Sequence, residues 1–392
     1  EELFRVGYRL SRKTVIADDI ATIQATLSER VRWADVVVIS GGLGPTSDDK
    51  TVDAIAKLLQ TTVITHLPSK TQLLKAMALR GRTVNQHTLK QVTFPKGTDP
   101  IMNCVGFAPG FSVQIGKSRC FFLPGVPAEM KAMFVTVLAQ IEQLFGGSEK
   151  ILSRTWKCLG IAESDLQLLM DPVEASLPLS GWLGYRTRFP ENHLSVYFGS
   201  NSKEDHRSLN EVAEQIRASL LPWTYTEEDK ELEDLVLERL SLDQKLLVTA
   251  ESCTGGLAAQ RMSRIPGASK YLWGGYTAYQ VDAKKTMLDV VLKDPEQAVS
   301  KTCTRELAEN AKHKSGCDVS AAITGFMGPS DPMGTFYLCV IGKEVSEKHL
   351  FLPRNNRKEL QWGACTYLLR EILSCLQKEK QSCPIIKTNS PV

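Results

Sequence analysis

The stretch VVVISGGLGPTSDD at residues 36–49 decides the fold of the first part of the chain. Its opening run of β-branched apolar residues is typical of a strand that is buried on both faces of a parallel sheet. Glycines follow at once, and helical spacing of apolar residues is found at 20–31 before the run and at 52–59 after it. A strand, a glycine-rich turn and a helix in this order predict an α/β domain.

The same order returns at LLVTAESCTGG, residues 246–256, where a strand is expected over 246–249 and a helix from 256 onward. Between the two patterns, strand-like pieces alternate with a single helix, which indicates a small α+β module. From these patterns we predict four segments: an N-terminal α/β domain at 1–146, a middle α+β module at 147–225, a C-terminal α/β domain at 226–377 and a disordered tail at 378–392.

The composition argues against several classes of protein. Hydrophobic residues make up 43% of the 392 residues and charged residues 23%, which is ordinary for globular domains. A net charge of +3 offers little attraction for nucleic acid, so we expect no direct contact with it. No apolar run approaches the ~18 residues of a membrane span and no leader pattern opens the chain, so we expect no membrane contact and a cytoplasmic location.

The ten cysteines and six histidines show no metal-ligand spacing. No two cysteines form a C-x-x-C pair, and several lie inside apolar strand-like runs. Because a chain of this length needs no disulfide to fold, we expect reduced and mostly buried thiols.

The turn after the first strand carries groups that suit a phosphate ligand: Gly41, Gly42, Gly44 and Thr46. The glycines let backbone N–H groups approach a ligand closely, and the threonine adds a hydroxyl. The helix that follows presents its positive N-terminus to the same place. No Gly-Lys-Ser/Thr follows, so the turn is not a P-loop.

Asp48 and Asp49 close this turn. Their charges repel phosphate, but two carboxylates are able to hold a hard divalent cation that in turn neutralises phosphate oxygens. The alternative is an ordinary strand–helix loop in which an aspartate caps the helix.

A second set of reactive groups follows the strand at 246–249. Ser252 stands where a strand turns into a helix, near backbone N–H groups, which is the arrangement that acyl chemistry needs. Lys284 is the best candidate base, because a partly buried lysine has a lowered pKa, and Tyr279 is able to relay a proton. Thr254 either caps the helix or contacts the substrate. The alternatives are a helix-capping Ser252 and a solvated Lys284.

The first half of the chain resembles the molybdopterin-binding-like domain of the CinA family. The resemblance is carried by GGLGPTSDD at 41–49, NCVGFAPGF at 103–111 and LPGVPAEM at 123–130. It implies metal-dependent hydrolysis of ADP-ribose, with the diphosphate at the 41–49 turn and a divalent cation near Asp48 and Asp49.

The last part is similar to the C-terminal domain of the same family, a nicotinamide-mononucleotide deamidase. The matching motifs are ESCTGG at 251–256, PGAS at 266–269 and TGFMGP at 324–329, together with Tyr279 and Lys284. The resemblance implies Ser252 as the nucleophile, assisted by Lys284 and Tyr279, and no cofactor. It places further residues against the substrate: Cys253, Gly255, Gly256, Gly325 and, at the phosphate, Arg357. The alternative for Arg357 is a surface charge at a helix N-terminus.

The sequence departs from the family at several points. The family's first strand and helix would precede residue 7, and we expect residues missing from the given chain rather than a truncated domain. Phe107 replaces a small polar residue, Met327 replaces a small alanine, and the loop at 329–334 is short.

Two other functions stay open. One is binding of a pterin or a molybdenum-cofactor precursor at the 41–49 turn, and the other is a non-catalytic interaction protein connected with competence or DNA damage. We expect nicotinamide mononucleotide and ADP-ribose as ligands, and a homodimer because related deamidase domains assemble in pairs.

Overall fold

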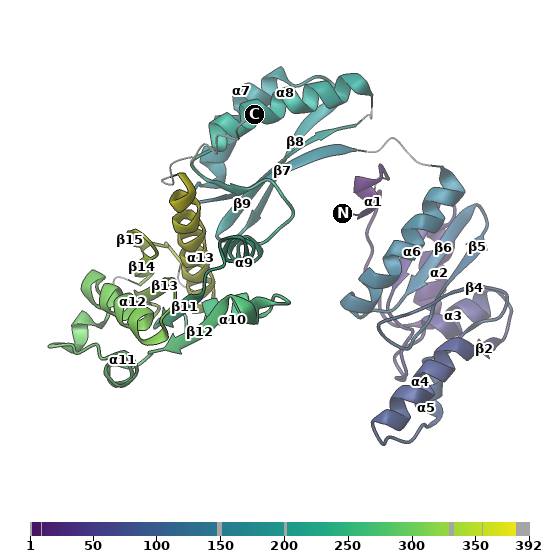
Figure 1. The fold of residues 1–392 in the computed structure, drawn as a ribbon. Coiled ribbons are helices and arrows are strands. Elements are labelled where there is room, and N and C mark those ends of the chain that lie inside the picture. Colours follow the sequence, from purple (N-terminus) through teal and green to yellow (C-terminus); the bar gives the residue numbers. More distant parts are fainter. Residues whose placement is uncertain are drawn as a thin grey trace, which may run out of the picture. The chain divides into compact units, whose positions relative to one another are not determined.

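The computed structural model describes residues 2–8, 10–146, 151–199, 202–328, 333–354 and 356–381. They divide into two compact units (Figure 1). The first holds the described residues up to Ile151 together with Gly199, and the second holds the other described residues from Leu152 onward. The α/β class is confirmed in both units. The predicted boundary at 147 lies outside the described residues. No helix in the described ranges is both long and apolar enough to cross a membrane.

The first unit contains these elements: α1 (Glu2–Arg5), α2 (Ile20–Arg30), β1 (Val36–Ser40), α3 (Thr51–Leu58), β2 (Val63–Thr65), α4 (Leu67–Leu79), α5 (Gln86–Lys90), β3 (Thr93–Pro95), β4 (Asp99–Ile101), β5 (Gly110–Ile115), β6 (Ser118–Leu123) and α6 (Pro127–Phe145). Its main sheet has the order β1-β6-β5-β4, with β1 parallel to β6 and the other pairs antiparallel. β5 and β6 form a hairpin that turns at residues 116–117, because Ile115 pairs with Ser118.

Successive side chains of β6 point to opposite faces of this sheet and contribute to a core on each face. Cys120 and Phe122 pack with residues of α2 and α3, whereas Phe121 and Leu123 pack with residues of α6. The expectation that the 36–40 strand is buried on both faces is wrong: β1 is only partly buried, and Val38 is 36% exposed. The reason is its position, since among the described strands β1 pairs with β6 alone.

The second unit begins with the middle module: β7 (Leu152–Leu159), α7 (Glu163–Ser176), β8 (Gly181–Arg188), β9 (Glu191–Phe198), α8 (Lys203–Leu220) and β10 (Thr224–Thr226). The antiparallel sheet order β10-β7-β9-β8 and the βαββαβ connectivity are those of a ferredoxin-like fold. Figure 1 shows α7 and α8 together on one face of this sheet. The polar first turn of α8 is capped by Ser202.

The rest of the second unit contains α9 (Leu232–Asp243), β11 (Leu247–Glu251), α10 (Leu257–Ser263), β12 (Leu272–Thr277), α11 (Val281–Leu288), α12 (Lys301–Ser315), β13 (Val319–Gly325), β14 (Thr335–Ile341), β15 (Val345–Phe351) and α13 (Arg357–Gln381). The sheet order is β12-β11-β13-β14-β15, and β11 is parallel to both of its neighbours. All five residues of β11 are buried, so the strand predicted here is confirmed.

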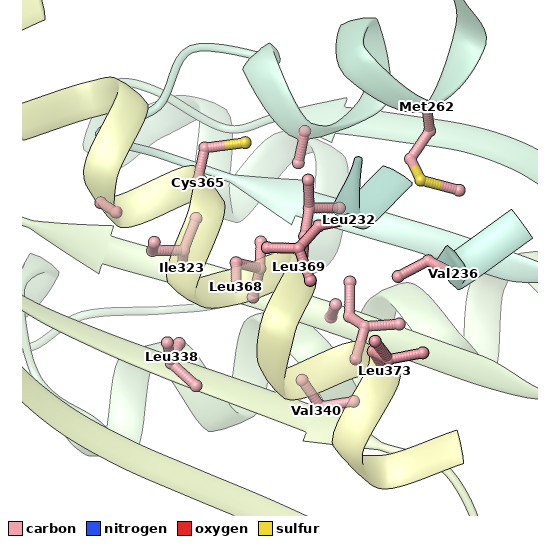
Figure 2. Close-up of a cluster of buried hydrophobic side chains, with 14 of the residues drawn as sticks. Leu232, Val236, Met262, Ile323, Leu338, Val340, Cys365, Leu368, Leu369 and Leu373 are labelled. Carbon is pink, nitrogen blue, oxygen red and sulfur yellow. The ribbon is translucent and has the colours of Figure 1, made fainter. Parts of the chain in front are cut away.

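Helices cover both faces of this second sheet. On one face, α9, α10 and α13 share a core with β13 and β14, in which Leu232, Ile323 and Leu369 lie together (Figure 2). On the other face, Val248 and Ala250 of β11 pack with residues of α12. α13 continues to Gln381, so residues 378–381 are helical and not part of a disordered tail. The remainder of the predicted tail and residues 329–332 of the short loop lie outside the described residues.

Candidate active sites

Ser252 lies directly after the carboxyl end of β11, between two parallel neighbours. Ligand sites of open α/β sheets lie at this edge. The Ser252 N–H donates to the carbonyl of Ile323 on β13 at 3.0 Å, which fixes the backbone at the strand end. Gly255 and Gly256 follow with φ of 65° and 94°, so the chain turns into α10 through a conformation that favours glycine.

Lys284 reaches Ser252 from α11. Its Nζ lies 2.9 Å from Ser252 Oγ, 2.7 Å from the carbonyl oxygen of Ala278 and 3.3 Å from that of Tyr279, and it donates to all three. The lysine is 1% exposed and Ser252 is 8% exposed. Burial lowers the pKa of Lys284, and the nearby thiols of Cys303 and Cys253 oppose this effect. A buried amine with a lowered pKa next to a hydroxyl is suited to accept that hydroxyl's proton.

Glu251 stabilises the turn between β11 and α10, a role that was not predicted from the sequence. The residue is 1% exposed, and its carboxylate accepts hydrogen bonds from the N–H groups of Ala258 and Ala259, both at 2.9 Å. It also accepts from the hydroxyls of Thr254 at 2.7 Å and Thr249 at 3.2 Å. The carboxylate therefore satisfies the first turn of α10, where the helix has free N–H groups. The sequence signal for this role is an acidic residue at the end of a buried apolar strand.

We expect Glu251→Ala to destabilise the protein strongly. The substitution leaves buried N–H and hydroxyl groups without an acceptor, which costs about 2–4 kcal/mol in the free energy of unfolding. Urea denaturation followed by circular dichroism measures the change. The exposed Glu309, which pairs with Arg305 at 2.8 Å, is the control: Glu309→Ala should change the free energy of unfolding by roughly 0.5 kcal/mol or less. Equal stability of the two variants would contradict the role given to Glu251.

Thr254 and Cys253 lie in the same turn as Ser252, but Lys284 donates a hydrogen bond to neither side chain in its described contacts. The buried Thr254 hydroxyl donates to Glu251, which favours a supporting role over a catalytic one. The Cys253 thiol is buried, and burial raises its pKa to about 12. A Cβ at Gly325 would lie 3.2 Å from Cys253 Sγ and 2.7 Å from Cβ of Phe336, so only glycine fits beside this turn.

Tyr279 and Arg357 form a polar pair at the exposed side of the site. Arg357, the first residue of α13, donates to Tyr279 Oη at 2.5 Å and to the carbonyl of Met327 at 3.0 Å. Tyr279 is 52% exposed, whereas the Met327 side chain is buried. The structure thus brings together four predicted residues from separate elements: Ser252, Lys284, Tyr279 and Arg357.

In the first unit, the 41–49 turn lines a pocket of about 310 Å³. The other lining residues come from the motifs at 103–111 and 123–130 and from the position directly after α5: Gln91, Phe107, Ala108, Pro124, Gly125, Val126 and Glu129. The Thr51 side chain lies against the turn at Gly42, because a Cβ at Gly42 would lie 2.2 Å from Thr51 Oγ1. The predicted residues Gly41, Gly42 and Gly44 all line it.

Asp49 lines the pocket, and Asp48 is exposed beside it. One oxygen of Asp49 accepts from the N–H of Thr46 at 2.8 Å and from its hydroxyl at 2.5 Å, so this carboxylate also closes the turn. Lys90, which the sequence reading missed, donates to the carbonyls of Thr46 and Asp49 at 2.8 and 2.7 Å. Its partners lie more than 40 positions away, so no local pattern marks it.

A second pocket carboxylate belongs to Glu129, which the sequence reading also missed. The fully buried Asn103 donates to Glu129 at 2.7 Å and to the carbonyl of Ala108 at 3.0 Å. No group of three or more potential metal ligands occurs in the described part of the chain. Asp49 and Glu129 are the carboxylates that line the pocket. Carboxylate oxygens are the ligand type that Mg²⁺ uses, and this ion keeps waters and binds substrate phosphates in addition to one or two carboxylates.

Comparisons with known proteins divide the chain at similar places. The family model described as "CinA C-terminal domain" matches residues 229–376, and that described as "Probable molybdopterin binding domain" matches residues 1–143. A CinA-like protein of Anaeromyxobacter dehalogenans strain 2CP-C is 34% identical over 370 residues, covering 92% of this chain and 90% of that protein. The chain belongs to the CinA family. A second CinA-like protein, from Citrifermentans bemidjiense, is 34% identical over 376 residues, covering 93% of this chain and 89% of that protein.

Among solved structures, a CinA-superfamily protein of Escherichia coli is similar at 29% identity and a TM-score of 0.35, covering 37% of this chain and 90% of that chain. In this CinA chain, the Ser252 site lies within the C-terminal match and the 310 Å³ pocket within the N-terminal match. Phe107, a departure from the family pattern, is part of the pocket wall.

Proposed function

We propose that the C-terminal domain hydrolyses the carboxamide of nicotinamide mononucleotide to nicotinic acid mononucleotide and ammonia. The observation that carries the proposal is the buried 2.9 Å hydrogen bond between Lys284 Nζ and Ser252 Oγ. A serine activated by an adjacent base suits acyl transfer, and the family resemblance narrows the acyl group to this amide.

The reaction begins when Ser252 Oγ attacks the carboxamide carbon and passes its proton to neutral Lys284. The amide C–N bond then breaks, and Lys284 returns the proton to the departing nitrogen, which leaves as ammonia. A water molecule hydrolyses the resulting ester, again with Lys284 as the base, which frees the carboxylate and restores the serine hydroxyl. Proton transfer by a positioned base contributes about 10²–10⁴-fold to such a rate.

Hydrogen bonding around Lys284 supports this role. A neutral amine has two N–H donors and one lone pair, and the carbonyls of Ala278 and Tyr279 are able to accept both donors. The lone pair then faces Ser252, whose hydroxyl becomes the donor. The two carbonyls therefore hold the amine in place in both of its protonation states.

The backbone of the turn supplies the donors for the oxyanion. The Gly255 N–H already donates to the Ser252 carbonyl at 3.1 Å, so we assign the oxyanion to N–H groups of Cys253, Thr254 or Gly256. Arg357 binds the substrate phosphate, since a guanidinium is able to donate two parallel hydrogen bonds to it. Its present partner, the exposed Tyr279 hydroxyl, is replaceable by a phosphate oxygen.

The experiment that tests the proposal is ammonia release from nicotinamide mononucleotide by the full chain, with and without a chelator. Release that resists the chelator supports an amidase that works without metal. If the folded protein releases no ammonia from nicotinamide mononucleotide, the amidase proposal is wrong.

We also propose that the N-terminal domain hydrolyses ADP-ribose to AMP and ribose 5-phosphate with a divalent cation. The proposal is supported by the pocket, whose glycine turn suits a diphosphate and whose Asp49 and Glu129 suit a hydrated cation. Asp48, exposed at the rim, is the other candidate ligand. When bound, the cation neutralises charge on the diphosphate.

We expect a chelator to abolish ADP-ribose hydrolysis and Asp49→Asn to lower it by roughly 10–100-fold, as is typical when a metal site is disturbed. The asparagine still accepts from Thr46, so the turn should keep its shape while the negative charge is lost. AMP formation measured by chromatography reports the activity, and ammonia release by the same samples is the internal control. Chelator-resistant AMP formation would contradict the metal dependence.

Pterin binding stays the second candidate for this pocket, favoured by the match to the molybdopterin-binding family model. Calorimetric titration with a pterin phosphate separates the two functions. Tight pterin binding without ADP-ribose turnover would favour the pterin.

A further inference from the structure

A hairpin of the middle module packs against the segment that carries Arg357. Phe189 lies in the turn between β8 and β9, and it packs against the core of the C-terminal domain. The guanidinium of Arg354 lies over the Phe189 ring, 4.5 Å from its centroid, which is a cation–π contact. Arg354 stands three positions before Arg357 in the connection between β15 and α13.

Gly363 shows how closely the hairpin approaches the helix. It lies inside α13, where glycine weakens a helix relative to alanine. A Cβ at this position would lie 3.2 Å from Cε1 of Phe189 and 2.7 Å from Cδ1 of Leu352. The glycine therefore makes room for two side chains, one from the middle module and one from the β15–α13 connection.

The connection itself is fixed at both ends. At its start, buried Leu352 donates its N–H to the carbonyl of Gly334 at 3.0 Å, and Phe189 packs beside it. At its end, the Asn356 side chain accepts from the N–H of Lys358 at 2.9 Å and so caps α13. Arg357 is the first residue of the helix, and its guanidinium position depends on where this connection lies.

We propose that Phe189 is a positioning residue for the substrate phosphate, so that the middle module shapes the phosphate end of the deamidase site. The phenyl ring wedges between Arg354 and α13 and holds the β15–α13 connection in the place that directs Arg357 toward Tyr279. The ligand chemistry is a phosphate monoester on a ribose, recognised by a guanidinium. This inference rests on the proposed function.

The test measures binding, so that it does not depend on turnover. In a Ser252→Ala background, calorimetry compares nicotinamide mononucleotide with nicotinamide riboside, which carries the same amide without the phosphate. Arg357→Ala should weaken mononucleotide binding by roughly 10–100-fold, the range for a charge-assisted hydrogen bond. Phe189→Ala should weaken it by about tenfold, and neither substitution should change riboside binding by more than about twofold.

Further variants separate positioning from general damage. Phe189→Ala added to Arg357→Ala should cause no further loss, because Phe189 acts through Arg357. Gly363→Ala places a methyl group against the Phe189 ring and should weaken mononucleotide binding as much as Phe189→Ala does. Phe189→Tyr keeps the ring and should bind the mononucleotide as tightly as the parent. Trp182→Ala is the matched control, since Trp182 lies on β8 and stacks on Tyr197 of the same module.

Several outcomes would overturn the inference: parent-like mononucleotide binding by Phe189→Ala, an equal loss for riboside, or additive losses in the double variant. Lack of mononucleotide binding by the Ser252→Ala parent would also overturn it. Ammonia release by the unsubstituted chain is measured in parallel and decides the amidase proposal by itself.

Discussion

Replacing Ser252 with alanine is expected to lower ammonia release from nicotinamide mononucleotide by roughly a thousandfold or more, as loss of a nucleophile does in other acyl-transfer enzymes. The hydroxyl oxygen is the atom that forms the acyl ester, and no other hydroxyl receives a hydrogen bond from Lys284 in the described part of the chain. Initial rates at saturating substrate, with and without chelator, measure the effect. The free energy of unfolding should change little, because Ser252 Oγ donates to no structural acceptor in its described contacts.

Ser263→Ala is the matched control. This serine lies exposed on α10, a short distance along the chain from the nucleophile, and its hydroxyl donates to the Gln260 carbonyl at 2.9 Å. We expect its activity to equal that of the parent. If ammonia release survives Ser252→Ala, the nucleophile lies elsewhere, and Thr254 is the first position to examine.

The parts of the fold that the sequence predicted are those governed by local patterns. β11 is a continuous apolar run because helices cover both faces of its sheet, and the glycines after it mark the turn at the candidate site. β12 escaped prediction because Gly274 and Gly275 interrupt its pattern. A Cβ at Gly275 would lie 2.4 Å from Thr249 Oγ1, so the close packing of β12 against β11 requires glycine here. The same glycine breaks the apolar pattern by which a strand is recognised.

Residues of the sites that were missed depend on distant partners. Lys90, the last residue of α5, donates to carbonyls of the 41–49 turn, and Asn103 donates to Glu129, which lies 26 positions further along the chain. The two members of each pair are too far apart in the sequence for a local pattern to connect them. α12, by contrast, had a readable signal: Ser300 caps it, and buried residues recur at helical spacing from Cys303 to Ala311. Local signals predict elements, whereas contacts between elements appear only once the chain is folded.

The second large effect is expected at Lys284. Lys284→Met keeps the length of the side chain but removes the base, and we expect kcat to fall by about 10²–10⁴-fold. Lys284→Arg should be equally inactive, because a guanidinium retains donors but does not lose its proton. The exposed neighbour Lys285 provides the control, and Lys285→Met should have parent activity. Activity in the arginine variant would show that a positive charge, rather than a base, is what the reaction needs.

The pH dependence of kcat tests the same assignment in the unsubstituted chain. The reaction needs the neutral amine, so the rate falls as the pH falls through the pKa of Lys284 and reaches a plateau above it. Because burial lowers this pKa, the midpoint of the rise in rate should lie below 10.5, the ordinary pKa of lysine. The folded protein binds this proton more weakly than the unfolded chain, so the same group favours folding increasingly as the pH rises from the lowered pKa toward 10.5. A rate that rises only near 10.5 would mean that Lys284 is not the base.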